Sequence, residues 1–535
     1  MGRLEGGNDG IPGCAVGPLG EENPLQKLRL LVACAALAAC AVTVPTTASA
    51  QSSPAAQATS TFDYTKNLHP IGYSERTVPL DNTVPGAGVF NSDLAFEGTM
   101  AVQGTYAGFR LIDVSEPGEP EEIVNWTECA SPTNTVGNQG DVIVWGDLVF
   151  RSWNSPTPPP TNPDGTAIPV TDPARFTTPG AFCGDWPMFR SLPTPEHPVN
   201  PPALDFGQEG VHIIDISDPE NPDVIGFVDT PCGSHTETLA PDLENNRLLI
   251  YSNSSANTTF GSPAPGEMPL QCAGIDIIEV PLDDPASASY LRFEQAGDPM
   301  EEEHHSCHDT GVIHGDANLV ACAGTAGGTN TGVNVFSTDP ADGGSKEDPA
   351  WLYHKVTGGI SLGHSAAFTW DGEVLIVGHE PGGGSGAECE ATDDPLRRTF
   401  FFLDADTGAS LGQFTIPRPQ TNVENCTTHN YNVVPTRNGY VMVSGNYQSG
   451  ISVIDFTDPA NAKEIAYADP APLIDPNPPV GIELGGDWST YWYNGKIYES
   501  DITRGLIIWQ LSDRAVAGAR QLNRLNPQTV PFTFD

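Results

Sequence analysis

The segment Gly108-Phe-Arg-Leu-Ile-Asp-Val-Ser-Glu-Pro117 returns along the chain as Gly210-Val-His-Ile-Ile-Asp-Ile-Ser-Asp-Pro219 and as Gly450-Ile-Ser-Val-Ile-Asp-Phe-Thr-Asp-Pro459. In each copy a glycine precedes four or five apolar or β-branched residues, and an acid, a hydroxyl residue and a proline follow. The apolar run is typical of a buried strand. The end of the segment is typical of a turn, because proline fixes φ and the Asp or Ser side chain bonds nearby backbone N–H groups. Weaker copies begin at Gly274, Gly332, Phe400 and Gly505.

Each copy belongs to a larger unit. Upstream lies a turn-bounded apolar hairpin such as Ser365–Gly378, and downstream lies another short strand such as Asp223–Val228. Four short antiparallel strands, repeated in seven units, predict an all-β fold, the seven-bladed β-propeller with four-stranded antiparallel blades. We expect the blades at about residues 91–126, 138–230, 233–297, 306–357, 362–417, 427–468 and 486–511.

The seventh unit stops after its third strand. The segment Leu68-His-Pro-Ile-Gly-Tyr73 mimics the outer strand Asp223-Val-Ile-Gly-Phe227, so we expect this N-terminal strand to complete the last blade and close the ring without free edges. The propeller then spans residues 67–513, after a linker over 51–66 and before a C-terminal tail over 514–535. The Pro-rich insertion Ser155–Phe206 in the second blade lacks periodic apolar segments, which predicts a loop.

These units resemble LVIVD repeats, which occur in secreted and surface-associated bacterial and archaeal proteins. The resemblance covers roughly residues 90–511 and is strong in blades 1, 2 and 6, whereas the copies in blades 3, 4, 5 and 7 are degenerate. It implies a propeller fold and export. It implies no catalytic residue, because most members of that family have no assigned activity.

The N-terminal region predicts export. Lys27 and Arg29 precede the apolar run Leu30–Val44, and Thr47-Ala-Ser-Ala50 follows, which together indicate a signal peptide cleaved after Ala50. Residues 1–26 would be an N-terminal extension or an over-long start, and the apolar run is too short for a membrane span. Alternatively, Leu37-Ala-Ala-Cys40 resembles a bacterial lipobox that would leave a lipid anchor on Cys40. Both interpretations place the protein outside the cytoplasm, secreted or at the cell surface.

The cysteines fit an exported protein. Three of the 11 lie in the predicted leader, and an even number remains. In an oxidising compartment this predicts four disulfides, for which sequential pairing is one of 105 possible connectivities. The eight cysteines are Cys129, Cys183, Cys232, Cys272, Cys307, Cys322, Cys389 and Cys426.

The charge is strongly acidic, with 68 Asp and Glu against 23 Lys and Arg and a net charge of −45. Such a surface repels phosphate backbones, so nucleic acid is not an expected partner. It fits a protein that stays soluble outside the cell or that attracts cations. We expect a monomer whose partner is an extracellular protein, a glycan or a small molecule.

Four units carry a histidine where their innermost strand begins. In a propeller these equivalent positions converge on one mouth of the central channel, and three or four imidazoles with an open position suit Zn, Fe or Cu. The seventh unit has Asp487 there, and the first two offer Asn91 or Asp93 and Gln139 or Asp141. The predicted metal ligands are His235, His308, His364, His429 and Asp487.

A purely structural interpretation competes with the metal site. In WD-repeat propellers a histidine just before the inner strand forms a hydrogen bond within its own blade and binds nothing. The cluster Glu301-Glu-Glu-His-His305 is either a further source of ligands or a solvated acidic loop. The Asp-Pro turns could hold Ca²⁺, although no D-x-D-x-D-G loop is present. The catalytic residues and any substrate are unknown from the sequence.

The sequence therefore supports two functions. The first is an exported LVIVD-type propeller that acts as a binding platform at or outside the cell surface. The alternative is a metal-dependent enzyme with a histidine-ringed site at the channel mouth. No G-x-S-x-G, P-loop or dinucleotide-binding motif points to another enzyme class.

Overall fold

The computed structural model describes residues 52–76, 90–129, 139–153, 161–166, 168, 172–176, 181–188, 210–230, 234–253, 274–297, 307–324, 331–382, 384, 386–472 and 486–534. The predicted leader with Cys40, the cluster Glu301–His305 and most of the insertion Ser155–Phe206 lie outside these residues. No helix among the described residues is both long and apolar enough to span a membrane.

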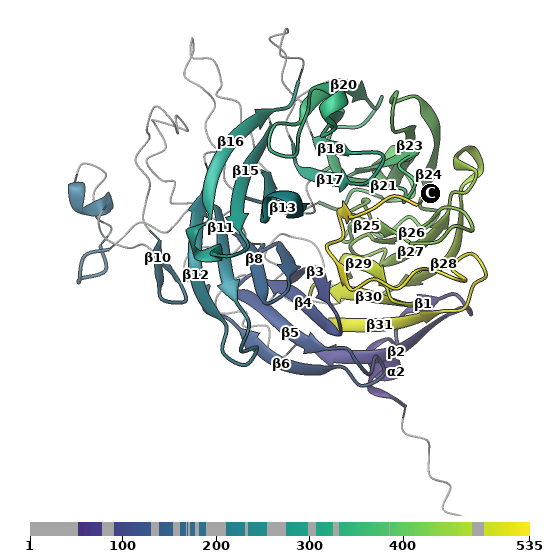
Figure 1. Ribbon diagram of the computed structural model, residues 1–535. Coiled ribbons are helices and arrows are strands. Elements are labelled where there is room, and N and C mark those ends of the chain that lie inside the picture. Colours follow the sequence, from purple (N-terminus) through teal and green to yellow (C-terminus); the bar gives the residue numbers. More distant parts are fainter. Residues whose placement is uncertain are drawn as a thin grey trace, which may run out of the picture. The chain divides into compact units, whose positions relative to one another are not determined.

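Seven small antiparallel sheets ring an axis and confirm the predicted propeller (Figure 1). Blades 1 and 2 consist of β3 (Asn91–Glu97), β4 (Met100–Thr105), β5 (Gly108–Asp113) and β6 (Glu121–Trp126), then β7 (Val142–Trp145), β8 (Leu148–Trp153), β11 (Gly210–Asp215) and β12 (Asp223–Asp229). Blades 3 and 4 consist of β13 (Thr236–Asp242), β14 (Arg247–Asn253), β15 (Gly274–Pro281) and β16 (Ser289–Gln295), then β17 (Asp309–Ile313), β18 (Leu319–Gly324), β19 (Gly332–Ser337) and β20 (Ala350–Val356).

The remaining blades follow the same order. Blades 5 and 6 consist of β21 (Gly363–Phe368), β22 (Val374–His379), β23 (Thr399–Asp404) and β24 (Ser410–Thr415), then β25 (Asn430–Val433), β26 (Val441–Gly445), β27 (Ile451–Asp455) and β28 (Lys463–Asp469). Blade 7 consists of β29 (Asp487–Tyr493), β30 (Lys496–Asp501), β31 (Gly505–Leu511) and β2 (Leu68–Glu75). The innermost strands of neighbouring blades contact one another all the way round, and the core fills the space between blades.

Short elements decorate the blades. They are α2 (Pro54–Ala58), the hairpin β9 (Ala181–Cys183) and β10 (Trp186–Met188) in the insertion of blade 2, and the 3-10 turns η2 (Pro173–Phe176), η3 (Leu243–Asn245), η4 (Pro285–Ser287), η5 (Pro340–Asp342), η6 (Pro395–Arg398) and η7 (Pro459–Asn461). Five of these turns begin with Asp followed by Pro, and Asp172, Asp339 and Asp394 accept a hydrogen bond from the backbone N–H two residues on. The Asp-Pro pairs therefore start turns between the third and fourth strands, just before the third strand, or in the insertion of blade 2.

The recurring segment forms the third strand of every blade. Its glycine is required by close approach, because a side chain at Gly210 would collide with the carbonyl of Val228 in the fourth strand. Gly505 stands equally close to the carbonyl of Ser74 in β2. Strand β2 pairs antiparallel with β31 from Leu68↔Leu511 to Glu75↔Gly505 and lies beside it in Figure 1. The predicted closure of the ring by the N-terminal strand is confirmed.

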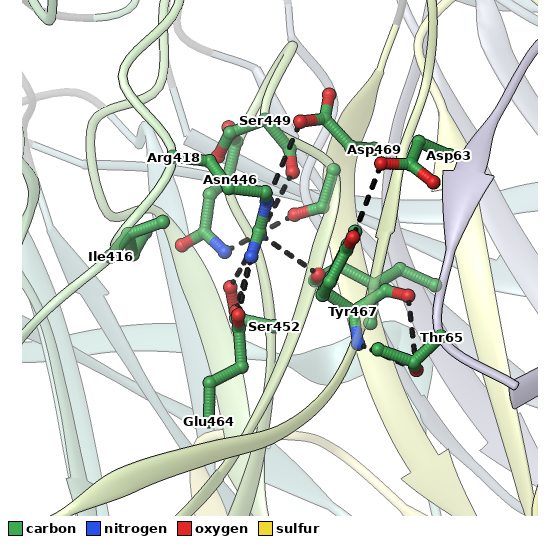
Figure 2. A network of polar contacts seen from close by, with 12 residues as sticks. Asp63, Thr65, Ile416, Arg418, Asn446, Ser449, Ser452, Glu464, Tyr467 and Asp469 are labelled. Carbon is green, nitrogen blue, oxygen red and sulfur yellow. Dashed lines mark hydrogen bonds and ion pairs between the residues drawn. The ribbon is translucent and has the colours of Figure 1, made fainter. Parts of the chain in front are cut away.

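The N-terminal segment also extends blade 6. Strand β1 (Asp63–Tyr64) pairs with β28, and a polar network secures it (Figure 2). Arg418 stacks on the Tyr467 ring at 4.3 Å and forms an ion pair with Glu464 at 2.5 Å. Tyr467 accepts a hydrogen bond at its carbonyl from Thr65 N, 3.0 Å, and its hydroxyl donates to Asp63 at 3.1 Å. Tyr467 of blade 6 thus links Arg418, which follows blade 5, to the N-terminal segment.

The C-terminal tail contacts all seven blades in succession. It carries two short strands, β32 (Arg524–Leu525) beside β3 and β33 (Thr529–Val530) parallel to β17. The hydrogen bonds run from blade 6 round to blade 5: Arg520 N to Pro435 O, Leu522 N to Asn494 Oδ1, Gly98 N to Asn523 O, Asn526 Nδ2 to Val144 O, Thr529 Oγ1 to Leu239 O, His314 N to Val530 O and Phe534 N to Trp370 O.

Three disulfides join Cys129 to Cys183, Cys307 to Cys322 and Cys389 to Cys426. They match sequential pairing. Cys232 and Cys272 lie outside the described residues. Such disulfides suggest an oxidising environment outside the cytoplasm.

Candidate metal centre

The propeller brings the four predicted histidines together. His235, His308 and His429 immediately precede the innermost strands β13, β17 and β25, and His364 is the second residue of β21. Because these strands stand side by side, residues at equivalent positions meet in the channel. The ring centroids lie 4.8 Å apart for His235 and His308, 4.2 Å for His308 and His364, and 4.3 Å for His364 and His429.

All four imidazoles are buried and neutral. Each side chain belongs to a residue no more than 9% exposed. Burial lowers the pKa of His308 to about 4 and that of His429 to about 3. Burial and the neighbouring imidazoles hold the pKa values of His235 and His364 well below the ordinary value. Neutral imidazole is the form that binds a metal, so no proton has to leave these rings at neutral pH.

Hydrogen bonds fix the tautomers of two of these rings. His429 Nδ1 donates to the Trp488 carbonyl at 2.5 Å, which leaves the lone pair on Nε2. Ser365 Oγ donates to the His429 carbonyl at 3.0 Å, so it accepts from His364 Nδ1, and His364 also keeps its lone pair on Nε2. A bond from one ring nitrogen to a carbonyl or hydroxyl is the arrangement that orients metal-binding histidines.

Both lone pairs face a carboxylate that the sequence analysis did not identify. His364 Nε2 lies 3.7 Å and His429 Nε2 lies 3.9 Å from the oxygens of Glu380. Glu380 directly follows β22, outside the repeated inner-strand position, so the repeat gave no signal for it. Burial raises its pKa to about 8, opposed by a hydrogen bond from Tyr447.

These atoms fit a metal ion. Among the described residues, one group of three His, Cys, Asp or Glu places its ligand atoms within 4.8 Å of one another: His308, His364 and Glu380. The separations to Glu380 exceed a hydrogen bond, yet suit two ligands that each approach an ion to about 2.0–2.2 Å. His308 Nδ1 is also buried without a hydrogen-bond partner. Two imidazoles and a carboxylate are ligands for Zn²⁺ and for non-haem Fe²⁺.

Asp487 takes a different place from the one expected. It is fully buried, but its carboxyl accepts from Thr490 Oγ1 at 2.6 Å and shares a hydrogen bond with Glu499. The residue that blade 7 contributes to the channel cavity is Trp488. His235 contacts His308 but is not part of the group around Glu380.

The cavity beside the histidines is small, because the centre of a water-sized molecule can occupy only about 20 Å³ of it. Of the alternatives in blades 1 and 2, Asp93, Gln139 and Asp141 line it, whereas Asn91 donates to the carbonyl of Asp501. The lining residues are Asp93, Gln139, Asp141, His235, Thr236, Asp309, His364, His429, Asn430, Trp488 and Gln528.

The cavity also holds carboxyls that retain protons. Asp93 Oδ1 accepts from Leu94 N at 2.8 Å and from the Tyr491 hydroxyl at 2.6 Å. Burial and the nearby charge of Asp93 raise the pKa of Asp141 well above its ordinary value. The same two causes raise the pKa of Asp309 to about 8. Neutral imidazoles and proton-holding carboxyls thus share one cavity.

No protein-family model matches the chain, and no curated protein matches it. The LVIVD resemblance stays a prediction. Among solved structures, a provisionally assigned 6-phosphogluconolactonase from Bacteroides uniformis is similar at 10% identity and a TM-score of 0.41, covering 77% of this chain and 95% of its own. The computationally designed Ika8 protein is similar at 10% identity and a TM-score of 0.39, covering 82% and 100%. At these values neither likeness bears on function.

Proposed function

We propose that the propeller binds one divalent transition-metal ion in its channel through His308, His364 and Glu380, with His429 as a further ligand. The observation that supports this most is the pair of Nε2 atoms at 3.7 and 3.9 Å from the Glu380 carboxylate. Hydrogen bonds at Nδ1 leave a lone pair on each of them. Without an ion, buried lone pairs face a buried acid across a gap too long for hydrogen bonds.

The ion would supply Lewis-acid or redox chemistry, with Zn²⁺, Fe²⁺ and Cu²⁺ as the candidates that imidazole favours. The chain itself contributes neutral imidazoles, the Glu380 carboxyl, and a cavity in which Asp141 and Asp309 hold protons. Asp141 and Asp309 could give or take a proton from a molecule bound in that cavity. This is the metal-dependent alternative of the two functions that the sequence suggested.

A binding platform outside the cell is the second candidate. The propeller fold supports such a role, and the disulfides and the net charge of −45 suit it. The two candidates are compatible if the channel metal is structural. Export by the predicted signal peptide is part of both proposals.

The test is metal content. Protein purified without chelators or metal-affinity columns is expected to carry one Zn, Fe or Cu per chain by elemental analysis, or to bind one such ion after dialysis. His364→Ala is expected to lose that metal while remaining folded. His314→Asn is the matched control, because His314 is equally buried but follows β17 beside the C-terminal tail. A folded wild type that takes up no stoichiometric metal contradicts the proposal and favours the platform.

A further inference from the structure

Tyr447 adopts a backbone conformation that bulky residues rarely take. Its φ is +49°, and the other three described non-glycine residues with positive φ are asparagines. This conformation is unfavourable for a non-glycine side chain and persists only where the surroundings impose it. Here the turn between β26 and β27 is fixed by Tyr447 N to Asp487 O at 3.0 Å, Asp487 N to Tyr447 O at 2.9 Å and Gly450 N to Tyr447 O at 2.9 Å.

This backbone conformation places the Tyr447 phenol against Glu380 and His429. The Tyr447 hydroxyl donates a hydrogen bond to Glu380 Oε1, the same oxygen that faces His429 Nε2. Its ring centroid lies 4.4 Å from that of His429, and the residue is 4% exposed. Burial and Glu380 raise the pKa of the Tyr447 hydroxyl, so it remains a donor. The side chain therefore touches both the carboxylate and one of the imidazoles.

A glycine leaves room for this contact. Gly384 lies in the Gly-rich stretch 382–386, and a methyl group there would collide with the Tyr447 hydroxyl and stand 3.2 Å from Glu380 Oε1. Its φ of +73° is also unfavourable for other residues. Gly384 thus borders the hydrogen bond that Tyr447 donates to Glu380.

We infer that Tyr447 is a positioning residue that holds the Glu380 carboxylate toward His308 and His364 as a metal ligand, and that Gly384 keeps the space for it. The inference rests on the proposed function. Groups that hydrogen-bond a ligating carboxylate fix its orientation, and their loss typically weakens metal affinity about 10–100-fold.

The experiment compares Tyr447→Phe with Tyr431→Phe in the full chain. Tyr431 is equally buried and donates to the Ser365 and Ile376 carbonyls, but has no contact with Glu380. Zn²⁺ affinity, measured by competition with a chromophoric chelator, is expected to fall at least tenfold in Tyr447→Phe and to stay within twofold in Tyr431→Phe. The visible absorption of the Co²⁺-loaded protein, which reports the ligand set, is expected to shift in Tyr447→Phe toward that of Glu380→Gln and to stay unchanged in the control.

Gly384→Ala keeps the tyrosine but displaces its hydroxyl. This variant therefore replaces Tyr447→Phe in the experiment if Tyr447→Phe does not fold. It is expected to shift the Co²⁺ spectrum in the same direction and to weaken Zn²⁺ binding. If the wild type binds metal and both variants bind it with unchanged affinity and spectrum, Tyr447 is only a packing residue and the inference is wrong. If the wild type binds no metal, the proposed function fails and the inference fails with it.

Discussion

A buried histidine is structural or ligand-like according to what its second nitrogen meets. In His379 both nitrogens have protein partners, since Nδ1 bonds the Leu396 carbonyl at 2.7 Å and Nε2 accepts from Ser361 N at 3.0 Å. In His364 and His429 only Nδ1 has such a partner, and Nε2 faces Glu380. The same residue type therefore meets two different environments, and only the second leaves a lone pair that the proposed metal could use.

The carboxyl pair Asp487 and Glu499 makes stability depend on pH. Burial raises the pKa of Glu499 to about 7, and burial with the neighbouring Glu499 raises that of Asp487. The folded protein then holds a proton that the unfolded chain releases above about pH 4.5. The free energy of unfolding is therefore expected to fall as pH rises from 4.5 to 7. Glu499→Gln removes this loss. Between pH 5 and pH 8 the free energy of unfolding of the variant, relative to that of the wild type, should therefore rise by about 1–3 kcal/mol.

Urea unfolding of the metal-free proteins across that pH range measures the effect. Glu373→Gln, at an exposed position, is the control and should track the wild type at every pH. A difference between Glu499→Gln and wild type that does not change with pH would show that the pair keeps no proton.

At the scale of single residues, the sequence predicted the four histidines but did not predict Glu380 and Tyr447, which lie beside them. The four histidines share a position in the repeat, and a propeller brings repeated positions together. Glu380 lies in the connection after β22 and Tyr447 in the turn after β26, where the units differ in length and composition. Asp487 is the first residue of the inner strand β29, but it is the next residue, Trp488, that lines the cavity, and Asp487 pairs with Glu499.

At the scale of elements, the recurring segment and the strand that mimics an outer strand were predictable because local chemistry determines both. Except in blade 5, a glycine at the start of the third strand lies against the backbone of the fourth strand. In blade 7, β2 is that fourth strand. The tail was predictable only as a segment without repeats, because its hydrogen bonds go to seven separate blades.

Strand β2 should contribute to stability through its buried face. Leu68 is fully buried among residues of blades 6 and 7, whereas the next residue, His69, is exposed. Leu68→Ala is expected to lower the free energy of unfolding by about 2–5 kcal/mol, and His69→Ala by less than about 0.5 kcal/mol. Denaturant titration followed by tryptophan fluorescence measures both. Equal, small effects would mean that the ring closes without this strand.

At the scale of the whole molecule, two segments outside the repeats hold the ring. The N-terminal segment joins blades 6 and 7, and the tail bonds each blade in turn. A chain that ends after Ala519 is expected to melt about 10 °C or more below the full chain in calorimetry. Asn526→Ala removes only the two hydrogen bonds to Val144, so it should lower the melting temperature by a small part of that amount. An unchanged melting temperature after truncation would show that the inner strands suffice.

The position of the tail in the chain sets an order of events during biosynthesis. Residues 520–534 follow all seven blades. The last blade is complete only after β31 has been made, because β2 pairs with β31. A growing polypeptide can therefore form individual sheets early, but it cannot fasten them into a ring before residues 505–534 have been synthesised. Until then the blades lack both the strand exchange and the tail that join them, so the interfaces between blades are the last part of the fold to become fixed.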